Sequence, residues 1–230
     1  MLYSIQTPIR GTQSQYEKFI EGLEAQTCKD FELVICDDCS GREPIKPVVT
    51  SFTQRLVRIP KRLEGWAYPC ARNACIKHCN RSAQYMARID IDWVLRPDTL
   101  ANMKPLLSPN KYYEGWKQQA NGKLKQFGPF SIMPMDALLV CGGWDEIFFP
   151  HYSDWEDFKR RILLVRKMEV ISTQTLFADD TGEADHTIIR DRKFTRPIAK
   201  LLKRVGNIMP IVTDLFASEL IYRCRAKNEK

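Results

Sequence analysis

Two aspartates separated by one residue, Asp90 and Asp92, follow an apolar run at residues 84–89. That run favours a β-strand. The first carboxylate should then lie beside the pleated end of the strand, and the second should enter the crevice at the strand end. A divalent cation that bridges a diphosphate takes most of its ligands from phosphates and water, so one or two protein carboxylates suffice. The pair therefore predicts a Mn²⁺ or Mg²⁺ site that neutralises charge on a departing diphosphate, with a polar turn before Trp93 as the alternative.

A second acidic pair, Asp37 and Asp38, follows the apolar residues 31–36. Carboxylates just past a buried strand are costly unless they face solvent or a ligand. One of them is suited to accept a hydrogen bond from a nucleobase N–H or a ribose hydroxyl. The alternative is that they cap the next segment of the chain.

Residues 142–146 combine two glycines with Trp144, Asp145 and Glu146. Glycines allow close backbone approach, and a tryptophan offers a broad face on which a sugar stacks. The two carboxylates suit the hydroxyl groups of a sugar. Further along, Asp157 is placed to take a proton from an acceptor hydroxyl, although the acidic run 154–157 also suits the start of a helix.

His186 is one of only three histidines in the chain. It lies between an acidic stretch and basic residues, where a metal ion and phosphates would both find partners. A structural or solvated histidine is the alternative.

The elements that position these residues follow from the apolar pattern. A strand at residues 3–9, an amphipathic helix at 14–26 and a strand at 31–36 make a βαβ unit, whose parallel strands bind ligands at their carboxyl ends. The later segments are predicted in this order: a strand at 55–60, a helix at 72–79, a strand at 84–89, a helix at 97–103, a hairpin or mobile loop at 108–128, an apolar stretch at 131–140, a helix at 155–165 and a late edge strand at 168–173.

Composition favours one globular core. The 230 residues are 44% hydrophobic and 27% charged, which excludes general disorder. We therefore expect one domain at residues 1–189 and a basic helical extension at 190–230. The extension has eleven Lys or Arg against four acidic residues, so it accounts for the formal net charge of +7. Its amphipathic pattern suits either an anionic membrane surface or a helix packed on the domain.

The start of the chain shows neither a basic nor an apolar signal segment, and no stretch is apolar enough to span a bilayer. A cytoplasmic location is expected, with peripheral membrane contact through the extension as an open alternative. No nucleic-acid-binding module is recognisable, so no specific nucleic acid is expected as a partner. The eight cysteines are read as reduced, mostly buried thiols; packing is favoured over a zinc site built from Cys36, Cys39, Cys75 and Cys79.

Several motifs in the same order resemble glycosyltransferases of the GT-A fold, of the family-two type. They are Ser4-Ile5-Gln6-Thr7-Pro8, Ala25-Gln26-Thr27, the run from Asp30 through Ser40, Gly65 with Ala71-Arg72-Asn73, Asp90-Ile91-Asp92, Gly142 through Glu146, and Glu156-Asp157 with Arg161. The segment from His186 to Lys193 is similar to the one by which a galactosyltransferase branch supplies a histidine to manganese. The resemblance spans residues 3 to about 193.

This resemblance implies a Rossmann-like mixed sheet flanked by helices, and inverting sugar transfer from a UDP-sugar to a glycan, lipid-linked or other hydroxyl acceptor. The residues implied for each role are as follows: Pro8, Asp37, Asp38, Arg72 and Asp90 for the nucleotide; Trp144, Asp145 and Glu146 for the sugar or acceptor; Asp92 and His186, with Asp90, for the metal; and Asp157 as base with Glu156 beside it.

The sequence departs from the family pattern at two positions. Cys39 replaces a usual glycine, and Trp93 replaces a frequent third acidic residue. A non-catalytic sugar-nucleotide or glycan-binding module of the same fold stays open. A nucleotidyltransferase is less favoured, because the chain has no glycine-rich, lysine-bearing phosphate loop.

Overall fold

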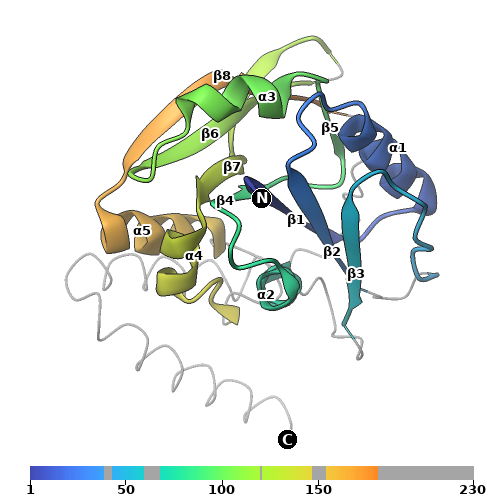
Figure 1. The fold of residues 1–230 in the computed structure, drawn as a ribbon, viewed down its shortest axis with the longest axis horizontal. Coiled ribbons are helices and arrows are strands. Elements are labelled where there is room, and N and C mark those ends of the chain that lie inside the picture. The colour runs from blue at the N-terminus through green and yellow to red at the C-terminus, as the bar shows by residue number, and fades with distance from the viewer. Residues whose placement is uncertain (39–42, 60–67, 120, 147–153, 181–230) are drawn as a thin grey trace, which may run out of the picture.

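The structure, a computed structural model, describes residues 1–38, 43–59, 68–119, 121–146 and 154–180. These residues form one mixed β-sheet with helices on both faces (Figure 1). The strands are β1 (Tyr3–Ile9), β2 (Phe31–Asp37), β3 (Thr53–Arg58), β4 (Tyr85–Arg88), β5 (Trp93–Leu95), β6 (Lys111–Gln118), β7 (Leu124–Pro134) and β8 (Glu169–Asp180). The helices are α1 (Gln13–Glu24), α2 (Tyr68–His78), α3 (Thr99–Met103), the 3₁₀ turn η1 (Lys104–Leu106), α4 (Met135–Cys141) and α5 (Asp154–Arg166).

The described strands lie in the order β3-β2-β1-β4-β7-β6-β8-β5. The first four are parallel, so the ends of β1, β2 and β4 meet at one edge of the sheet. Strand β7 then pairs antiparallel with β4, and β6 pairs antiparallel with β7. This arrangement confirms the predicted Rossmann-like half and adds a mixed second half.

Two apolar clusters cover the two faces of the sheet. One contains side chains of α1 and α3, among them Phe19 and Leu100. The other contains side chains of α2, α4 and α5, among them Cys75, Leu138 and Phe158. Strands β1 and β2 are buried at every position, as expected for parallel strands covered on both faces.

Local sequence explains where the first helix begins. Thr12 precedes α1 and accepts a hydrogen bond from the backbone N–H of Gln15, while the Gln15 side chain accepts one from the backbone N–H of Thr12. This capping box satisfies two N–H groups that the helix itself leaves unpaired. The helix therefore starts directly after β1 and Gly11, so only a short turn connects β1 to α1.

Two parts of the sequence prediction need correction. The segment after Met168 is not an edge strand: β8 continues to Asp180 and lies between β6 and β5. The short strand β5 takes the edge instead, and its three residues are too few to give a periodic signal. Of the two alternatives for residues 108–128, the structure shows the hairpin, formed by β6 and β7.

Among the described residues, no helix is long and apolar enough to cross a membrane. Six cysteines in this part of the chain are free thiols, and Cys36, Cys75 and Cys79 are buried, as the packing interpretation expects. The extension at 190–230 and His186 lie outside the described residues.

Candidate functional site

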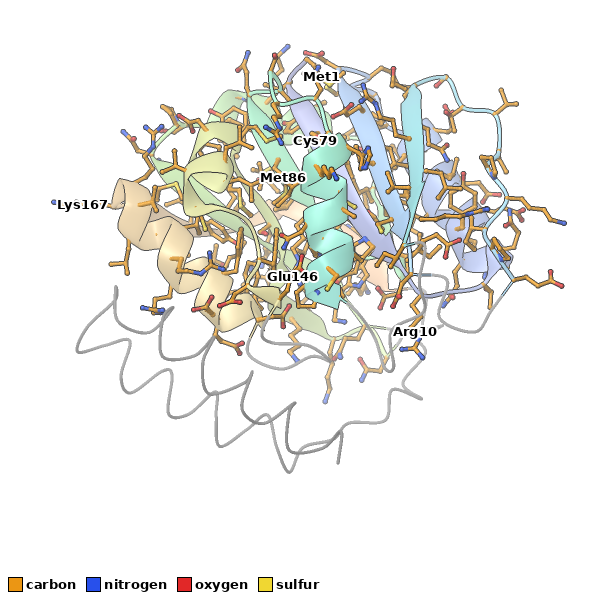
Figure 2. The ribbon with its side chains drawn as sticks, turned by 90° about the horizontal axis from the view of Figure 1, so that it is seen from below. Met1, Arg10, Cys79, Met86, Glu146 and Lys167 are labelled. Atoms are coloured by element: carbon orange, nitrogen blue, oxygen red, sulfur yellow. The ribbon has the colours of Figure 1, made fainter. Side chains whose placement is uncertain are left out.

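The candidate site lies at the carboxyl edge of β1, β2 and β4. In the parallel register Pro8 is level with Cys36, and Ile9 is level with Asp37. The chain beyond β4 is tied to β1, because the Thr7 hydroxyl donates to the carbonyl of Ile89 at 2.8 Å. Figure 2 shows Arg10, which follows β1, and Glu146 toward one edge of the molecule, with Met1 and Cys79 toward the opposite edge.

Asp90 and Asp92 lie in a turn directly after β4. The backbone N–H of Trp93 donates to the carbonyl of Asp90 at 3.2 Å, which closes the turn. Both aspartates are partly exposed, whereas Ile91 between them is buried. The turn therefore brings the two carboxylates to the sheet edge while the intervening side chain anchors it in the core.

One oxygen of Asp90 is fixed by the start of α2. Its Oδ1 accepts a hydrogen bond from the Tyr68 hydroxyl at 2.7 Å and another from Arg72 Nη2. No hydrogen bond to Oδ2 is made by the described residues, and the side chain is 23% exposed. Asp90 is thus held through one oxygen and keeps the other for an external partner.

Arg72 has a different position from the one predicted. It is fully buried, and besides Asp90 and Tyr68 it donates from Nη1 to the carbonyl of Gln6 at 2.8 Å. Direct contact with a nucleotide would require this guanidinium to leave these partners. In this structure Arg72 ties β1, α2 and Asp90 together, and its direct contact with a nucleotide stays a prediction.

Arg88, the last residue of β4, is a second buried guanidinium, with 3% exposure. Its Nη2 donates to the Tyr68 hydroxyl at 2.6 Å, and its guanidinium carbon lies 4.4 Å from the ring centroid of Trp155. Burial alone would lower the pKa of Arg88, but the neighbouring Tyr68, Asp90 and Asp154 raise it above the ordinary value. Arg88 therefore stays charged between the carboxylate after β4 and the one at the start of α5.

The acidic pair after β2 divides into two environments. Asp37 accepts a hydrogen bond from the backbone N–H of Ile45 at 3.0 Å and lies 3.6 Å from Arg58 Nε, so it organises the segment that follows. Asp38 is 2% exposed and is one of the charges that act on Cys70 at the start of α2. The capping interpretation thus holds for Asp37, and Asp38 lies near the start of α2.

Asn73 on α2 holds the glycine-containing segment 142–146. Its Nδ2 donates to the carbonyl of Trp144 at 2.8 Å and to Glu146 Oε1 at 2.9 Å, while its Oδ1 accepts from the N–H of Trp144 at 2.8 Å. We call these three bonds the Asn73 clasp. The clasp explains how the exposed Glu146 comes to lie beside the N-terminal half of α2 (Figure 2).

Trp144 does not present the predicted stacking face. It is 3% exposed, and its ring stacks on Phe158 with centroids 3.7 Å apart and an interplanar angle of 7°. The glycines before it allow a turn with positive φ, so the indole enters the core between α2 and α5. The Trp144 ring is therefore not exposed for stacking on a sugar in this structure, and its predicted sugar-binding role stays untested, whereas Asp145 and Glu146 are at least partly exposed.

The acidic start of α5 holds two carboxylates in different settings. Asp157 Oδ1 accepts from Arg160 at 3.1 Å, and Asp157 Oδ2 accepts from Arg161 Nε at 2.7 Å. Asp154 is 2% exposed and acts electrostatically on Tyr68 and Arg88. Asp154 is therefore the carboxylate that the structure connects to Asp90, while both oxygens of Asp157 are used within α5. Glu156 is exposed on the same helix.

In the described part of the chain, no three His, Cys, Asp or Glu side chains converge as a metal-binding group. Asp90 and Asp92 are the acidic pair, and the predicted third ligand, His186, lies outside the described residues. A partly exposed carboxylate with one oxygen already oriented fits a hard cation that takes its remaining ligands from phosphate and water. The residues present therefore fit Mn²⁺ or Mg²⁺ at this turn.

Sequence reasoning missed Tyr68, Arg88 and Arg10, and it gave Asp154 no role of its own. Arg10 follows β1, and its Nε and Nη1 are buried without a hydrogen bond among the described residues. A signal for Arg88 did exist: it is a charged residue inside the apolar run 84–89, and such a residue needs a buried partner. Tyr68 carried no signal, because only the fold brings it to the end of β4.

The sheet order, with carboxylates at its parallel edge, is that of the GT-A fold. The chain belongs to the family described as glycosyl transferase family 2, whose model matches residues 4–163. A curated relative, the bifunctional glycosyltransferase pgtA of Dictyostelium discoideum, is 26% identical over 95 residues. That match covers 40% of this chain and 12% of pgtA.

Solved structures agree in fold. The crystal structure of S. aureus TarS 1-349 superposes with a TM-score of 0.60 at 16% identity, covering 79% of this chain and 60% of that one. The mannosyltransferase PcManGT from Pyrobaculum calidifontis, in complex with GDP-Man and Mn²⁺, gives a TM-score of 0.55 at 16% identity, covering 78% of this chain and 56% of that one. TarS has also been solved in complex with UDP-GlcNAc. The chain thus spans somewhat more than half the length of these neighbours, and the likeness confirms the GT-A fold.

Proposed function

We propose that this glycosyltransferase moves a sugar from a UDP-sugar to an acceptor hydroxyl with inversion, using Mn²⁺ or Mg²⁺. The observation that carries the proposal is the anchored, partly exposed Asp90, whose Oδ2 has no hydrogen bond among the described residues and which shares a turn with Asp92 at the carboxyl edge of the parallel strands. The complexes of TarS with UDP-GlcNAc and of PcManGT with GDP-Man and Mn²⁺ support a sugar-nucleotide donor and a divalent cation.

The donor is proposed to lie across the edge formed by β1, β2 and β4. Asp38 is the acceptor for nucleoside hydrogen bonds, and Pro8 and Asp37 shape the edge around it. Arg10 has two guanidinium nitrogens without a hydrogen bond among the described residues, so it suits the negative charge of a diphosphate. Arg72 supports the donor indirectly, through Asp90.

Asp92 and Asp90 are the proposed metal ligands, with His186 as a further ligand from outside the described residues. A bound cation would offset the negative charge that grows on the leaving diphosphate. The protein's own contribution is to hold the two carboxylates at the strand end before the donor arrives.

In the proposed transfer, the acceptor oxygen forms a bond to the anomeric carbon while the bond from that carbon to the diphosphate breaks. UDP leaves with the bonding electron pair, and the acceptor's proton passes to a carboxylate of the protein. The geometry favours Asp154 over Asp157 for this role, because a proton going to Asp157 would have to displace an arginine N–H. Asp145 and Glu146 are the proposed acceptor-side carboxylates.

Replacing Asp154 and Asp157 separately with asparagine tests the function and the base together. With UDP release as the assay, Asp154→Asn should lose at least about a hundredfold in turnover, the lower range for general base catalysis. Its affinity for UDP in Mn²⁺, measured by calorimetry, should stay within about threefold of wild type, since a base contributes to the chemical step. Asp157→Asn should retain most of the turnover.

The opposite pattern, with Asp157→Asn inactive and Asp154→Asn active, would restore the base predicted from the sequence. If the unaltered protein binds no UDP-sugar in the presence of Mn²⁺ or Mg²⁺, the proposed function itself fails. Removing the metal with EDTA should abolish UDP release, and adding Mn²⁺ back should restore it.

A further inference from the structure

Two buried cations converge on the hydroxyl of Tyr68. Arg72 Nη2 and Arg88 Nη2 both donate to this oxygen, and the guanidinium carbons lie 4.7 Å and 5.3 Å from the Tyr68 ring centroid. Tyr68 and Arg72 come from α2, and Arg88 comes from the next strand, β4. The hydroxyl is therefore enclosed on one side by groups that can only donate hydrogen bonds.

This arrangement fixes the direction of the Tyr68 hydroxyl hydrogen. Since both arginines donate, the Tyr68 oxygen accepts from them, and its own hydrogen is left for Asp90 Oδ1 at 2.7 Å. The ordinary pKa of a tyrosine hydroxyl is about 10, so the hydroxyl keeps that hydrogen throughout the physiological range. Tyr68 is thus a donor of fixed direction toward one oxygen of Asp90.

The consequence for Asp90 is a carboxylate with two unlike oxygens. Oδ1 receives Tyr68 and Arg72, whereas Oδ2 has no hydrogen bond from the described residues. Rotation of the carboxylate would exchange the two oxygens, and it would break both of these bonds. A buried charge-assisted pair of this kind holds a rotamer much more firmly than a surface contact does.

Arg88 is the member of this group whose presence needs explanation. It is 3% exposed, and its Nε and Nη1 have no hydrogen bond among the described residues, so a stability role alone accounts poorly for it. Its one hydrogen bond goes to Tyr68, and the aromatic faces of Trp155 and Trp144 lie within 4.4 Å and 5.7 Å of its guanidinium carbon. The charge is therefore placed where it acts on Asp90 through Tyr68.

We propose that Tyr68 and Arg88 are positioning residues for the donor site, which direct Oδ2 of Asp90 toward the cation or the nucleotide. The inference rests on the proposed function, because it assigns Asp90 to the bound donor. Neither residue touches the donor; each acts through the carboxylate that does.

The test compares Tyr68→Phe with Tyr3→Phe as a matched control. Tyr3 is also buried and donates one hydrogen bond, to the carbonyl of Leu100 at 2.9 Å, but it belongs to the apolar cluster on the other face of the sheet. Calorimetry of UDP binding in Mn²⁺ should show affinity about tenfold weaker for Tyr68→Phe, as expected for a lost hydrogen bond to a charged group. Tyr3→Phe should stay within about twofold of wild type, since its loss is confined to stability.

A double-mutant cycle with Asp90→Asn separates positioning from general damage. If Tyr68 acts through Asp90, then Tyr68→Phe should change UDP affinity by less than about twofold once Asp90 is asparagine. An equal loss in both backgrounds, or equal affinities for Tyr68→Phe and Tyr3→Phe, would overturn the inference while leaving the proposed function intact. Failure of the wild-type protein to bind UDP in Mn²⁺ would instead refute the proposed function, and this inference with it.

Discussion

Replacing Asn73 with alanine removes the clasp that joins α2 to the segment 142–146. Two of its three bonds go to the backbone N–H and carbonyl of Trp144, and the third goes to the exposed carboxylate of Glu146. Because Trp144 is buried against Phe158, its backbone groups cannot simply turn to water. The substitution therefore leaves a partly buried donor and acceptor unpaired.

The expected cost follows from these contacts. Each of the two bonds with the Trp144 backbone contributes about 1 kcal/mol, and the exposed bond to Glu146 contributes less. Asn73→Ala should thus lower the free energy of unfolding by about 2–3 kcal/mol. UDP affinity should change little, since Asn73 contacts neither Asp90 nor Arg72 in the hydrogen bonds described.

Gly143 lies against Asn73 and offers a second test of the clasp. It has φ +83°, and a Cβ at this position would lie 2.6 Å from Oδ1 of Asn73. Gly143→Ala therefore carries both backbone strain of about 1–2 kcal/mol and a displaced clasp. Removing Asn73 first eliminates the collision but not the strain. The double variant should be more stable than the sum of the two single losses implies, by about 1–2 kcal/mol.

Urea denaturation followed by tryptophan fluorescence and by circular dichroism measures all three variants, and coincident curves justify a two-state treatment. Asn80→Ala is the control, since the partly exposed side chain of Asn80 accepts the local N–H of Ser82 at its Oδ1 atom, at 2.9 Å, and makes a weak contact from Nδ2 to the sulfur of Met1. Strict additivity of Asn73→Ala and Gly143→Ala would refute the clasp, and so would a loss for Asn73→Ala no larger than that of the control.

Two further predictions concern the charges around the site. Arg88→Met should cost about 3 kcal/mol in unfolding free energy because it removes a buried charge that interacts with Asp154 and donates to the Tyr68 hydroxyl. Arg96→Met should cost less than about 1 kcal/mol, because Arg96 is exposed and pairs with Asp179 at 3.3 Å on the surface. Equal urea midpoints for Arg88→Met and Arg96→Met would contradict the larger stabilising role expected of the buried Arg88. Burial, and then the charge of Glu146, raise the pKa of Cys70 to about 12, so Glu146→Gln should lower that pKa and speed alkylation of Cys70 at pH 9. Peptide mass spectrometry after iodoacetamide treatment measures this rate, and an unchanged rate would show that Glu146 does not act on the thiol.

The parts of the fold that sequence reasoning predicted are those with a strong local signal. Strands β1 and β2 are continuous apolar runs bounded by turn residues, and α1 carries the spacing of an amphipathic helix with a capping box. The turn of Asp90 and Asp92 was found because it directly follows β4, so its place at the edge depends only on chain order. Local patterns of this kind survive in the folded chain because tertiary packing agrees with them.

The parts that were missed depend on contacts between distant segments. Tyr68 and Asp90 are twenty-two residues apart, and nothing in either local pattern predicts that they bond. The sequence alone does not place the ring of Trp144, because a tryptophan after two glycines has the same local pattern whether its ring enters the core or faces a sugar. The ring of Phe158 decides the matter, and Phe158 becomes its neighbour only when α5 packs beside α4.

The buried arginines Arg72 and Arg88 act on two carboxylates of the site, Asp90 and Asp154. Arg72 is fully buried and Arg88 nearly so, and between them they fix Tyr68, Asp90 and the electrostatic setting of Asp154. Asp90 is therefore already held in place by the protein, through Tyr68 and Arg72. A carboxylate that is fixed in advance costs little to orient when the ligand arrives, and this is the condition under which electrostatic stabilisation is most effective. We infer that Asp90 sets the geometry of the proposed donor site before the ligand binds.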